Sequence, residues 1–389
     1  MNNHNNHNSE INADNIIKVS GTPFEMGFQQ GKKFAGQIQE TFRHIIKFEG
    51  IQTIKPKILP NFIFSYLLKQ KIVKDWKKLI EILAPTLYER MLGISNGAKT
   101  PLEELFVVQA LEILSDDVSL VTTGGCTSFA VLPERYAGNE MILGKNFDFM
   151  ETFKDDNIIR FSSPDRKFKS IELTYKQLSG SHDGMNEKGL VVLYNYGITS
   201  ERTKTRLPIT LLVQQILENC ATVEEALILL ESFRYPNAAI LLIADSKDTV
   251  VSVEISPDHI SHRHPDNGII ANTNMFLCPE TKLYDLPHTV HYSKNAPGDL
   301  AGNRIHETNE LRFSAAMNIL NSEKGKLQLD TLKSILSDHN GKPGGDDNTV
   351  CRHGKFFTTQ ASAMFFPKHR KVLITMGTPC NNEYKEYRL

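Results

Sequence analysis

The sequence predicts an α+β protein built from layered, mainly antiparallel sheets. Up to about residue 115, apolar side chains recur at steps of three and four, which is typical of amphipathic helices. From Gly125 onward, short runs rich in β-branched and aromatic residues are separated by Gly, Pro and Asn, which is typical of strands. Because these strands come in runs and do not alternate strictly with helices, they favour antiparallel sheets.

Composition divides the chain into three parts. Residues 1–15 are rich in Asn and His and poor in apolar side chains, so we expect a disordered tail. Residues 16–125 are predicted to be mostly helical, and residues 126–389 contain the strands. The 389 residues with 40% hydrophobic content are enough for one large core, and we expect one globular unit overall.

Two capping-box patterns with proline at the first helical position mark helix starts in the N-terminal part. Thr22-Pro23-Phe24-Glu25 predicts a long helix that continues to about residue 45. Thr100-Pro101-Leu102-Glu103 predicts a helix to about residue 114. Between them, residues 61–92 are expected to be helical, with a break near Pro85.

After residue 125, strands and later helices are predicted from local pattern. Strands are expected at 127–132, 141–149, 158–161, 170–175, 189–197, 238–244, 250–255, 361–366 and 372–377. Helices are expected at 208–219, 223–233, 308–320 and 329–336.

Charge and cysteine content exclude several classes of protein. The 44 basic and 45 acidic residues are scattered and give a net charge of −1, so no nucleic-acid partner is expected. The five cysteines are widely spaced with no CxxC pair, which predicts neither a disulfide framework nor a cysteine zinc site. No apolar run approaches eighteen residues and no signal-type segment is visible, so we expect a cytoplasmic protein without stable membrane insertion.

Cys126 is the main candidate for chemistry. It follows two glycines and opens an apolar strand, where the backbone is least restricted. Cleavage between Gly125 and Cys126 would leave one residue with a thiol and a free α-amine, whose reference pKa values are roughly 8.5 and 7.7 to 8.0. Nucleophile and base would then lie on the same residue. The alternative is that Cys126 is a small buried hydrophobic residue.

Candidate partners for Cys126 are a carboxylate and several amides. Asp148 follows by 22 residues, across a predicted turn, so a hairpin would bring it beside Cys126. The strand after Gly184 reaches Asn195, and Asn274 lies in an irregular segment after an apolar strand. Asparagine side chains are neutral donors suited to an oxyanion, although each of these residues could also be a turn former.

The chain resembles the N-terminal-nucleophile hydrolases of the penicillin (isopenicillin-N) acyltransferase-like cysteine peptidase family, relatives of the choloylglycine hydrolases. The resemblance runs through nearly the whole chain after residue 18. The segments that carry it, in order, are GTPFEMGFQQGKKF, PTLYERMLGISNGA, GGCTSFAV, ILGKNFDF, DGMNEKGLVVLYN, NTNMF, PGD with ELRF, DHNGKPGG and QASAMFFPKHRKVLITMGTPC.

The resemblance implies a four-layer αββα sandwich, made as a precursor that cuts itself before Cys126. Residues 1–125 would remain as a smaller subunit associated with the catalytic segment 126–389. The substrate would be a small molecule, a linear amide or acyl thioester, and the acyl group would pass through a thioester on Cys126 to water or an amine. This chemistry requires no metal or organic cofactor.

The resemblance also implies roles for individual residues. The carboxylate that holds the amine falls on Asp148, and the oxyanion asparagine falls on Asn274, with a second near Asn195. The arginine that supports the nucleophile falls on Arg312. Lys145 stands where the choloylglycine branch has arginine, so it keeps the charge but loses the bidentate fork.

Two rival functions remain open. An unprocessed thiol hydrolase would pair Cys126 with a distant histidine such as His182 or His339. A relative without catalysis would serve as a binding or structural protein. The segments Cys351-Arg352-His353 and Cys380 are interpreted as loop and strand-end structure.

Overall fold

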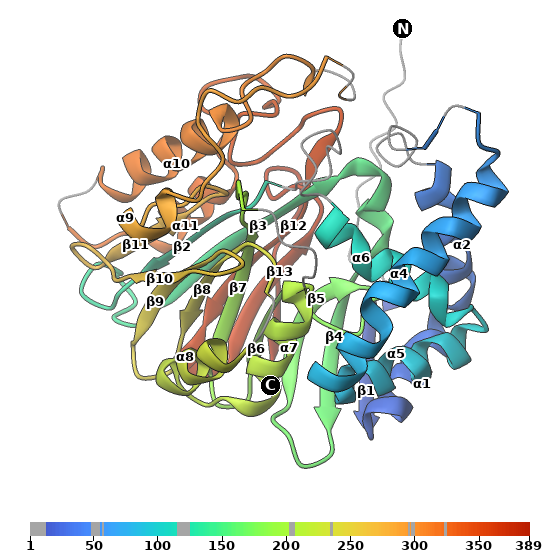
Figure 1. Ribbon diagram of the computed structural model, residues 1–389. Helices are drawn as coiled ribbons and strands as arrows, with labels where there is room; N and C mark the ends of the chain where they lie inside the picture. Colours follow the sequence, from blue (N-terminus) through green and yellow to red (C-terminus); the bar gives the residue numbers. More distant parts are fainter. Residues whose placement is uncertain are drawn as a thin grey trace, which may run out of the picture.

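Two sheets face each other at the centre of the molecule (Figure 1). The computed structural model describes residues 13–47, 55–56, 58–114, 125–201, 207–233, 236–294, 296, 300–322 and 325–389. In the order of pairing, the eight-stranded sheet contains β1 (Ile16–Gly21), β4 (Asn157–Pro164), β5 (Ser170–Tyr175), β6 (Asp183–Asn186), β7 (Val191–Tyr196), β8 (Ala239–Ala244), β9 (Val250–Ile255) and β10 (Ile260–Arg263). The six-stranded sheet contains β11 (Ile269–Asn272), β2 (Thr127–Val131), β3 (Ile142–Met150), β12 (Phe357–Phe366), β13 (Lys371–Met376) and β14 (Lys385–Arg388).

A helical layer covers the outer face of each sheet. The helices α7 (Ile209–Asn219) and α8 (Val223–Ser232) pack on the eight-stranded sheet, and α10 (Glu307–Leu320) and α11 (Leu329–Leu336) pack on the six-stranded one. The short helix α9 (Pro279–Lys282) follows β11. Alternation along β7 explains the layering, because Val192 faces the helices and Leu193 faces the other sheet. The four layers form the predicted αββα arrangement.

The five helices described in the N-terminal part pack beside the sheets, at the right of Figure 1. They are α1 (Pro23–Lys33), α2 (Ala35–Lys47), α4 (Asn61–Leu83), α5 (Pro85–Ala98) and α6 (Leu102–Leu114). Glycines allow α1 and α5 to approach closely. A Cβ on Gly27 would lie 2.1 Å from the Arg90 carbonyl oxygen, and one on Gly93 would lie 2.1 Å from the Phe24 carbonyl oxygen. These contacts explain why glycine stands at both positions, which lie in two of the segments that carry the family resemblance.

The N-terminal part differs from the sequence prediction in three places. It contributes β1, which pairs in parallel with β4 at the edge of the eight-stranded sheet, with Ile16 opposite Ile159. The long helix expected after Pro23 is interrupted at Phe34. The capping box at Thr22 is formed, but the Thr100 hydroxyl has no hydrogen-bond partner among the described residues. The expected tail lies outside the described residues up to residue 12.

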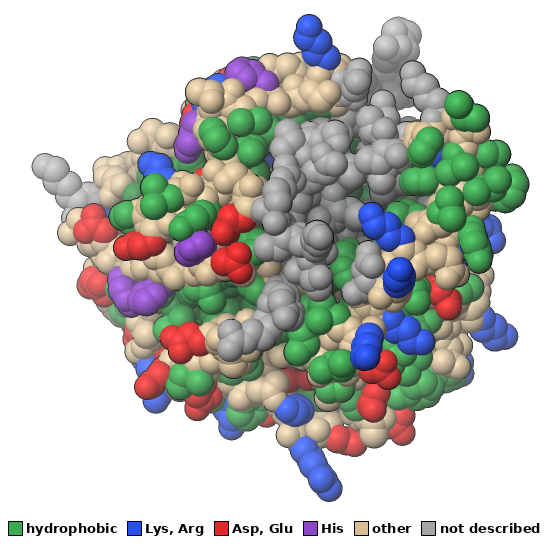
Figure 2. All heavy atoms as spheres, viewed as in Figure 1, with side chains coloured by type: hydrophobic (Ala, Val, Ile, Leu, Met, Phe, Trp, Pro, Cys, Tyr) green, Lys and Arg blue, Asp and Glu red, His purple; other side chains and the backbone are tan. Residues whose placement is uncertain are grey.

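The surface carries charges of both signs (Figure 2). Hydrophobic side chains are exposed over the N-terminal helices, and those on and just before α4 include Ile58, Phe62, Tyr66 and Leu67. Within the described ranges, none of the helices is both long and apolar enough to span a lipid bilayer.

Candidate active site

Cys126 lies directly before β2 and lines a pocket whose empty space, including the part open to solvent, is about 670 Å³. β2 pairs antiparallel with β3, and Thr127 lies opposite Asn146. This register places the Cys126 Sγ 4.0 Å from the backbone oxygen of Asp148, so the predicted hairpin is confirmed. Burial raises the pKa of the Cys126 thiol, which the ammonium of Lys145 opposes.

Asp148 has one satisfied and one unsatisfied carboxylate oxygen. The Thr359 hydroxyl donates to Oδ1 at 2.7 Å. Oδ2 is buried and has no hydrogen-bond partner among the described residues. Burial raises the pKa of Asp148 to about 6, although the nearby Arg352 and Arg312 lower it. The site therefore contains a buried acceptor that lacks a donor, beside the candidate nucleophile.

Arg312 extends from α10 to the backbone of Cys126. Its Nη1 donates to the Cys126 carbonyl oxygen at 2.7 Å and to the Thr127 hydroxyl at 2.9 Å. Its Nη2 donates to Asn274 Oδ1 at 3.1 Å. Burial, together with the charge of Arg352, lowers the pKa of Arg312 to about 10. The guanidinium thus fixes the position of Cys126 through its main chain.

Asn195 and Asn274, the two predicted oxyanion donors, are both fully buried. Asn195 Nδ2 lies 3.1 to 3.3 Å from the carbonyl oxygens of Cys126, Asn272 and Thr273. Asn274 Nδ2 donates to the Tyr196 carbonyl oxygen at 2.9 Å, and its Oδ1 accepts from Arg312. Neither residue belongs to the described lining of the pocket. Asn195 therefore holds the main chain around Cys126, and the oxyanion roles of Asn195 and Asn274 stay predictions.

Lys145 lies behind Asn195. It projects from β3 and is fully buried. Its Nζ donates to Asn195 Oδ1 at 2.9 Å and to the Tyr194 carbonyl oxygen, and it forms an ion pair with Asp183 Oδ1 at 3.3 Å. The structure therefore brings Lys145 together with Asn195, Arg312, Asn274 and Asp148 around Cys126.

Arg352 is a residue of this site that the sequence did not reveal. A Cβ on Gly125 would lie 1.8 Å from its Nη1, so the backbone of the predicted cleavage site packs directly against the guanidinium. Nη2 donates to Asp347 at 2.6 Å, and the guanidinium carbon lies 4.9 Å from the centre of the Phe357 ring. The Arg352 amide donates to the Thr359 hydroxyl at 2.9 Å. No spacing in the sequence links these residues to Cys126.

The pocket wall is mostly apolar and aromatic. The side chains that give it this character are Val108, Phe147, Phe149, Phe153, Tyr175, Leu178, Tyr194 and Tyr196. His182 also lines the pocket, and its ring centre lies 4.8 Å from that of Phe147 and 5.0 Å from that of Tyr175. Burial lowers the pKa of His182 to about 3, and the positive charge of Lys145 adds to the effect.

Glu112 is a second acidic residue in the pocket lining, besides Asp148. It accepts hydrogen bonds from the Tyr194 hydroxyl at 3.2 Å and the Thr210 hydroxyl at 3.0 Å, and from the Ile209 amide at the start of α7. Burial raises its pKa to about 7, and the Ile209 amide opposes this shift. Its carboxylate oxygens are thus partly satisfied by the N-terminus of a helix.

His339 is not part of the described pocket lining. It lies instead with Cys351, His353 and Cys380, and the potential ligand atoms of these four residues lie within 4.8 Å of one another. This cluster was not predicted from the sequence, because its members are spread over residues 339–380 without a CxxC pair.

The fold and the site together define the class of the protein. An αββα sandwich with a buried cysteine at the start of an inner strand is the arrangement expected of an N-terminal-nucleophile hydrolase. Residues 135–381 match the family model described as acyl-coenzyme A:6-aminopenicillanic acid acyl-transferase. The chain belongs to this family, and it is an enzyme of the amidohydrolase or acyltransferase class.

Solved structures of low sequence identity are also similar. A variant of conjugated bile acid hydrolase from Clostridium perfringens is 16% identical, covers 68% of this chain and 97% of its own, and has a TM-score of 0.44. The Caenorhabditis elegans ortholog of N-acylethanolamine-hydrolyzing acid amidase is 14% identical, with coverage of 62% and 93% and a TM-score of 0.42. Penicillin V acylase from Agrobacterium tumefaciens is 15% identical, with coverage of 64% and 83% and a TM-score of 0.40. The assignment rests on the family model, because these likenesses are too remote to carry it.

Proposed function

We propose that this enzyme is a self-processing cysteine amidohydrolase or acyltransferase. The Cys126 sulfur attacks the Gly125 carbonyl carbon, and the peptide bond is exchanged for a thioester as the Cys126 nitrogen takes up a proton. Water then hydrolyses the thioester, which releases a carboxylate on Gly125 and leaves Cys126 with a free thiol and α-amine.

In the processed enzyme, the same sulfur attacks the acyl carbon of the substrate. The α-amine of Cys126 takes the thiol proton and passes it to the leaving group, and a thioester remains on the sulfur. Water or an amine then attacks the thioester, and the thiol is regenerated. No metal or organic cofactor takes part in these steps.

The observation that carries the proposal is the unpartnered Oδ2 of Asp148. A buried carboxylate oxygen without a donor costs free energy, about 1–3 kcal/mol or more for a charged group. An ammonium group on Cys126 would supply the missing donor as a charge-assisted hydrogen bond, and it exists only after cleavage. The site is thus better satisfied in the processed enzyme than in the precursor.

The surrounding residues would divide the remaining tasks. Arg312 and Asn195 hold the Cys126 carbonyl, and Lys145 orients Asn195. Asn274 is the oxyanion donor that we propose, because its amide group has two N–H bonds and the described residues account for one acceptor, the Tyr196 carbonyl.

The unprocessed thiol hydrolase is less well supported. His182 is the pocket histidine that would act as its base. A conjugate acid with a pKa of about 3 is far too acidic to hold a proton taken from a thiol whose own pKa is raised.

The pocket favours a neutral, apolar acyl group. Its aromatic wall offers apolar contact area, and its described lining includes two carboxyl groups, Glu112 and Asp148, but no lysine or arginine. An anionic acyl chain would therefore lack a positive partner on this wall. We propose linear amides or acyl thioesters with uncharged acyl chains as substrates.

Intact mass with N-terminal sequencing tests the processing step in the wild type and in Cys126→Ala. We expect the wild type to yield a fragment ending at Gly125 and one beginning at Cys126, while Cys126→Ala stays whole. Cys220→Ala, at a buried cysteine at the end of α7, is the matched control and should be cut like the wild type.

A wild type that stays whole but hydrolyses amides would support the unprocessed thiol hydrolase. An uncut chain that binds apolar amides without turnover, in both the wild type and Cys126→Ala, would support the binding protein.

A further inference from the structure

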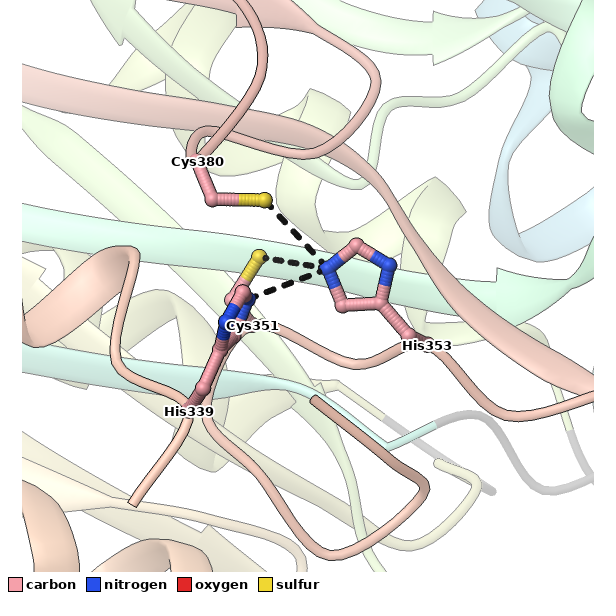
Figure 3. A group of neighbouring side chains, drawn as sticks. All are labelled: His339, Cys351, His353 and Cys380. Carbon is pink, nitrogen blue, oxygen red and sulfur yellow. Dashed lines mark hydrogen bonds between the residues drawn. The ribbon is translucent and has the colours of Figure 1, made fainter. Parts of the chain in front are cut away.

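His339, Cys351, His353 and Cys380 converge from three separate segments on one point. His339 follows α11, Cys351 and His353 precede β12, and Cys380 follows β13. Figure 3 shows their ligand atoms pointing toward one another. His353 Nε2 lies 3.2 Å from His339 Nε2, 3.4 Å from Cys351 Sγ and 3.3 Å from Cys380 Sγ.

Hydrogen bonding does not account for this convergence. An imidazole nitrogen has one N–H or one lone pair, so His353 Nε2 makes one good hydrogen bond at a time. Here three Lewis bases lie at hydrogen-bond distance from that nitrogen. A cation at the centre would interact with all four groups at once.

The spacing fits a tetrahedral zinc ion. With Zn–N near 2.0–2.1 Å and Zn–S near 2.3 Å, neighbouring ligand atoms of a tetrahedron lie about 3.3 to 3.8 Å apart. The three distances from His353 are 3.2, 3.3 and 3.4 Å, and the largest separation in the group is no more than 4.8 Å. Two sulfur and two nitrogen ligands in this geometry suit zinc.

The backbone around the cluster is held in place without a metal. The Asn146 amide, on β3, donates to the carbonyl oxygens of Leu336 and Val350 at 2.7 and 2.9 Å and so fixes both ends of the segment between them. Gly345, at a φ of 69°, lies close to both imidazoles. A Cβ there would lie 2.8 Å from the His353 ring and 3.0 Å from the His339 ring. The rings therefore have little freedom to turn away.

We propose that His339, Cys351, His353 and Cys380 bind a structural zinc ion. Four protein ligands close the coordination sphere, so the ion takes no substrate. Its ligands Cys351 and His353 flank Arg352, the residue that packs against Gly125 and whose amide donates to Thr359. The ion holds this segment against the site without taking part in the chemistry, and the inference does not rest on the proposed function.

Metal analysis of the full chain, purified without chelators and dialysed after exposure to Zn²⁺, tests the site. We expect about one zinc per chain in the wild type and less than about a tenth of that in Cys351→Ser and Cys380→Ser. Cys220→Ser and Cys278→Ser, at buried cysteines outside the cluster, are the matched controls and should keep the metal. A zinc-free wild type, or equal loss in the controls, overturns the proposal.

Cobalt substitution keeps the test informative if the cluster variants do not fold. Co²⁺ bound to the wild type should give the sulfur-to-cobalt charge-transfer band and the intense visible bands of a tetrahedral thiolate site. Weak octahedral bands would refute the site. So would a disulfide between Cys351 and Cys380, found by peptide mapping of protein kept without reductant. Cys126→Ala should bind the metal like the wild type, so that failure of processing and failure of metal binding are distinguished.

Discussion

Replacing Asp148 by asparagine should stabilise the uncut chain near neutral pH. The Cys126→Ala background prevents processing by Cys126, so Asp148 keeps its unpartnered oxygen. The pKa of this carboxyl rises from 3.8 to about 6 on folding. The folded state therefore binds more protons than the unfolded state between these values, and the free energy of unfolding falls as the pH rises through this window.

The size of the stabilisation follows from the difference between the folded and unfolded pKa of Asp148. About two pKa units correspond to roughly 3 kcal/mol of stability that is present near pH 4 and lost above pH 6. Asparagine resembles the protonated acid and does not ionise, so Cys126→Ala/Asp148→Asn should gain about that amount over Cys126→Ala at pH 7.5 and almost nothing at pH 4. For a chain of this length, 3 kcal/mol is roughly 4 °C in Tm.

Thermal unfolding of both variants at pH 4 and pH 7.5 measures the effect. Asp165→Asn in the same background is the control, because Asp165 is an exposed carboxylate in a turn. A stabilisation of equal size at both pH values, or a loss of stability at pH 7.5, would refute the view that burial of an unpaired charge dominates at Asp148.

Three further substitutions probe the same site. Gly125→Ala should slow self-cleavage at least tenfold, because its Cβ would clash with Arg352. This corresponds to a rise of about 1.4 kcal/mol in the activation free energy, and a time course on denaturing gels measures the rate. Arg312→Lys keeps the charge, but a single ammonium cannot reach both the Cys126 carbonyl and Asn274 Oδ1 as the two guanidinium nitrogens do, so urea unfolding should show a loss of about 1–3 kcal/mol. Thr359→Val removes a hydrogen bond that lowers the pKa of Asp148, so the acid limb of the pH–rate profile should move to higher pH.

Each of these predictions has a clear contrary result. Wild-type cleavage in Gly125→Ala would mean that the Arg352 guanidinium moves aside at no cost. Unchanged stability in Arg312→Lys would mean that the hydrogen bond to Asn274 contributes nothing. The control for Thr359→Val is Thr358→Val, because the Thr358 hydroxyl donates to Glu151 and not to Asp148. If the acid limb of the pH–rate profile moved equally in both variants, a specific effect on Asp148 would be excluded.

Local pattern was enough to predict the elements that have strong periodicity. β5, β9 and α11 have the predicted bounds, because their apolar residues and flanking turns define them without help from distant parts. β6, β10 and β14, with sequences DGMN, ISHR and KEYR, were missed. Their extended conformation depends on pairing with a neighbouring strand, which a four-residue polar segment does not reveal.

Two kinds of site residue could be predicted: those close to Cys126 along the chain, and those that the resemblance to a known family supplied. Asp148 followed from a hairpin, and Arg312 followed from the resemblance alone. Arg352 was missed because it meets Gly125 across a separation of 227 residues, the difference between the two residue numbers. The cluster around His353 was missed for the same reason, since its ligands approach only after α11, β12 and β13 have packed.

The pairing of strand β1 affects how the enzyme would unfold and refold after the proposed cleavage. This strand belongs to the segment before Gly125, yet it is hydrogen-bonded into the sheet of the segment after Cys126. Once the bond between these residues is cut, unfolding would separate two chains that had folded as one, and refolding would become a bimolecular reaction. We therefore expect a mature enzyme whose persistence is set by its rate of unfolding and which does not recover its structure on dilution from denaturant, although its uncut precursor does.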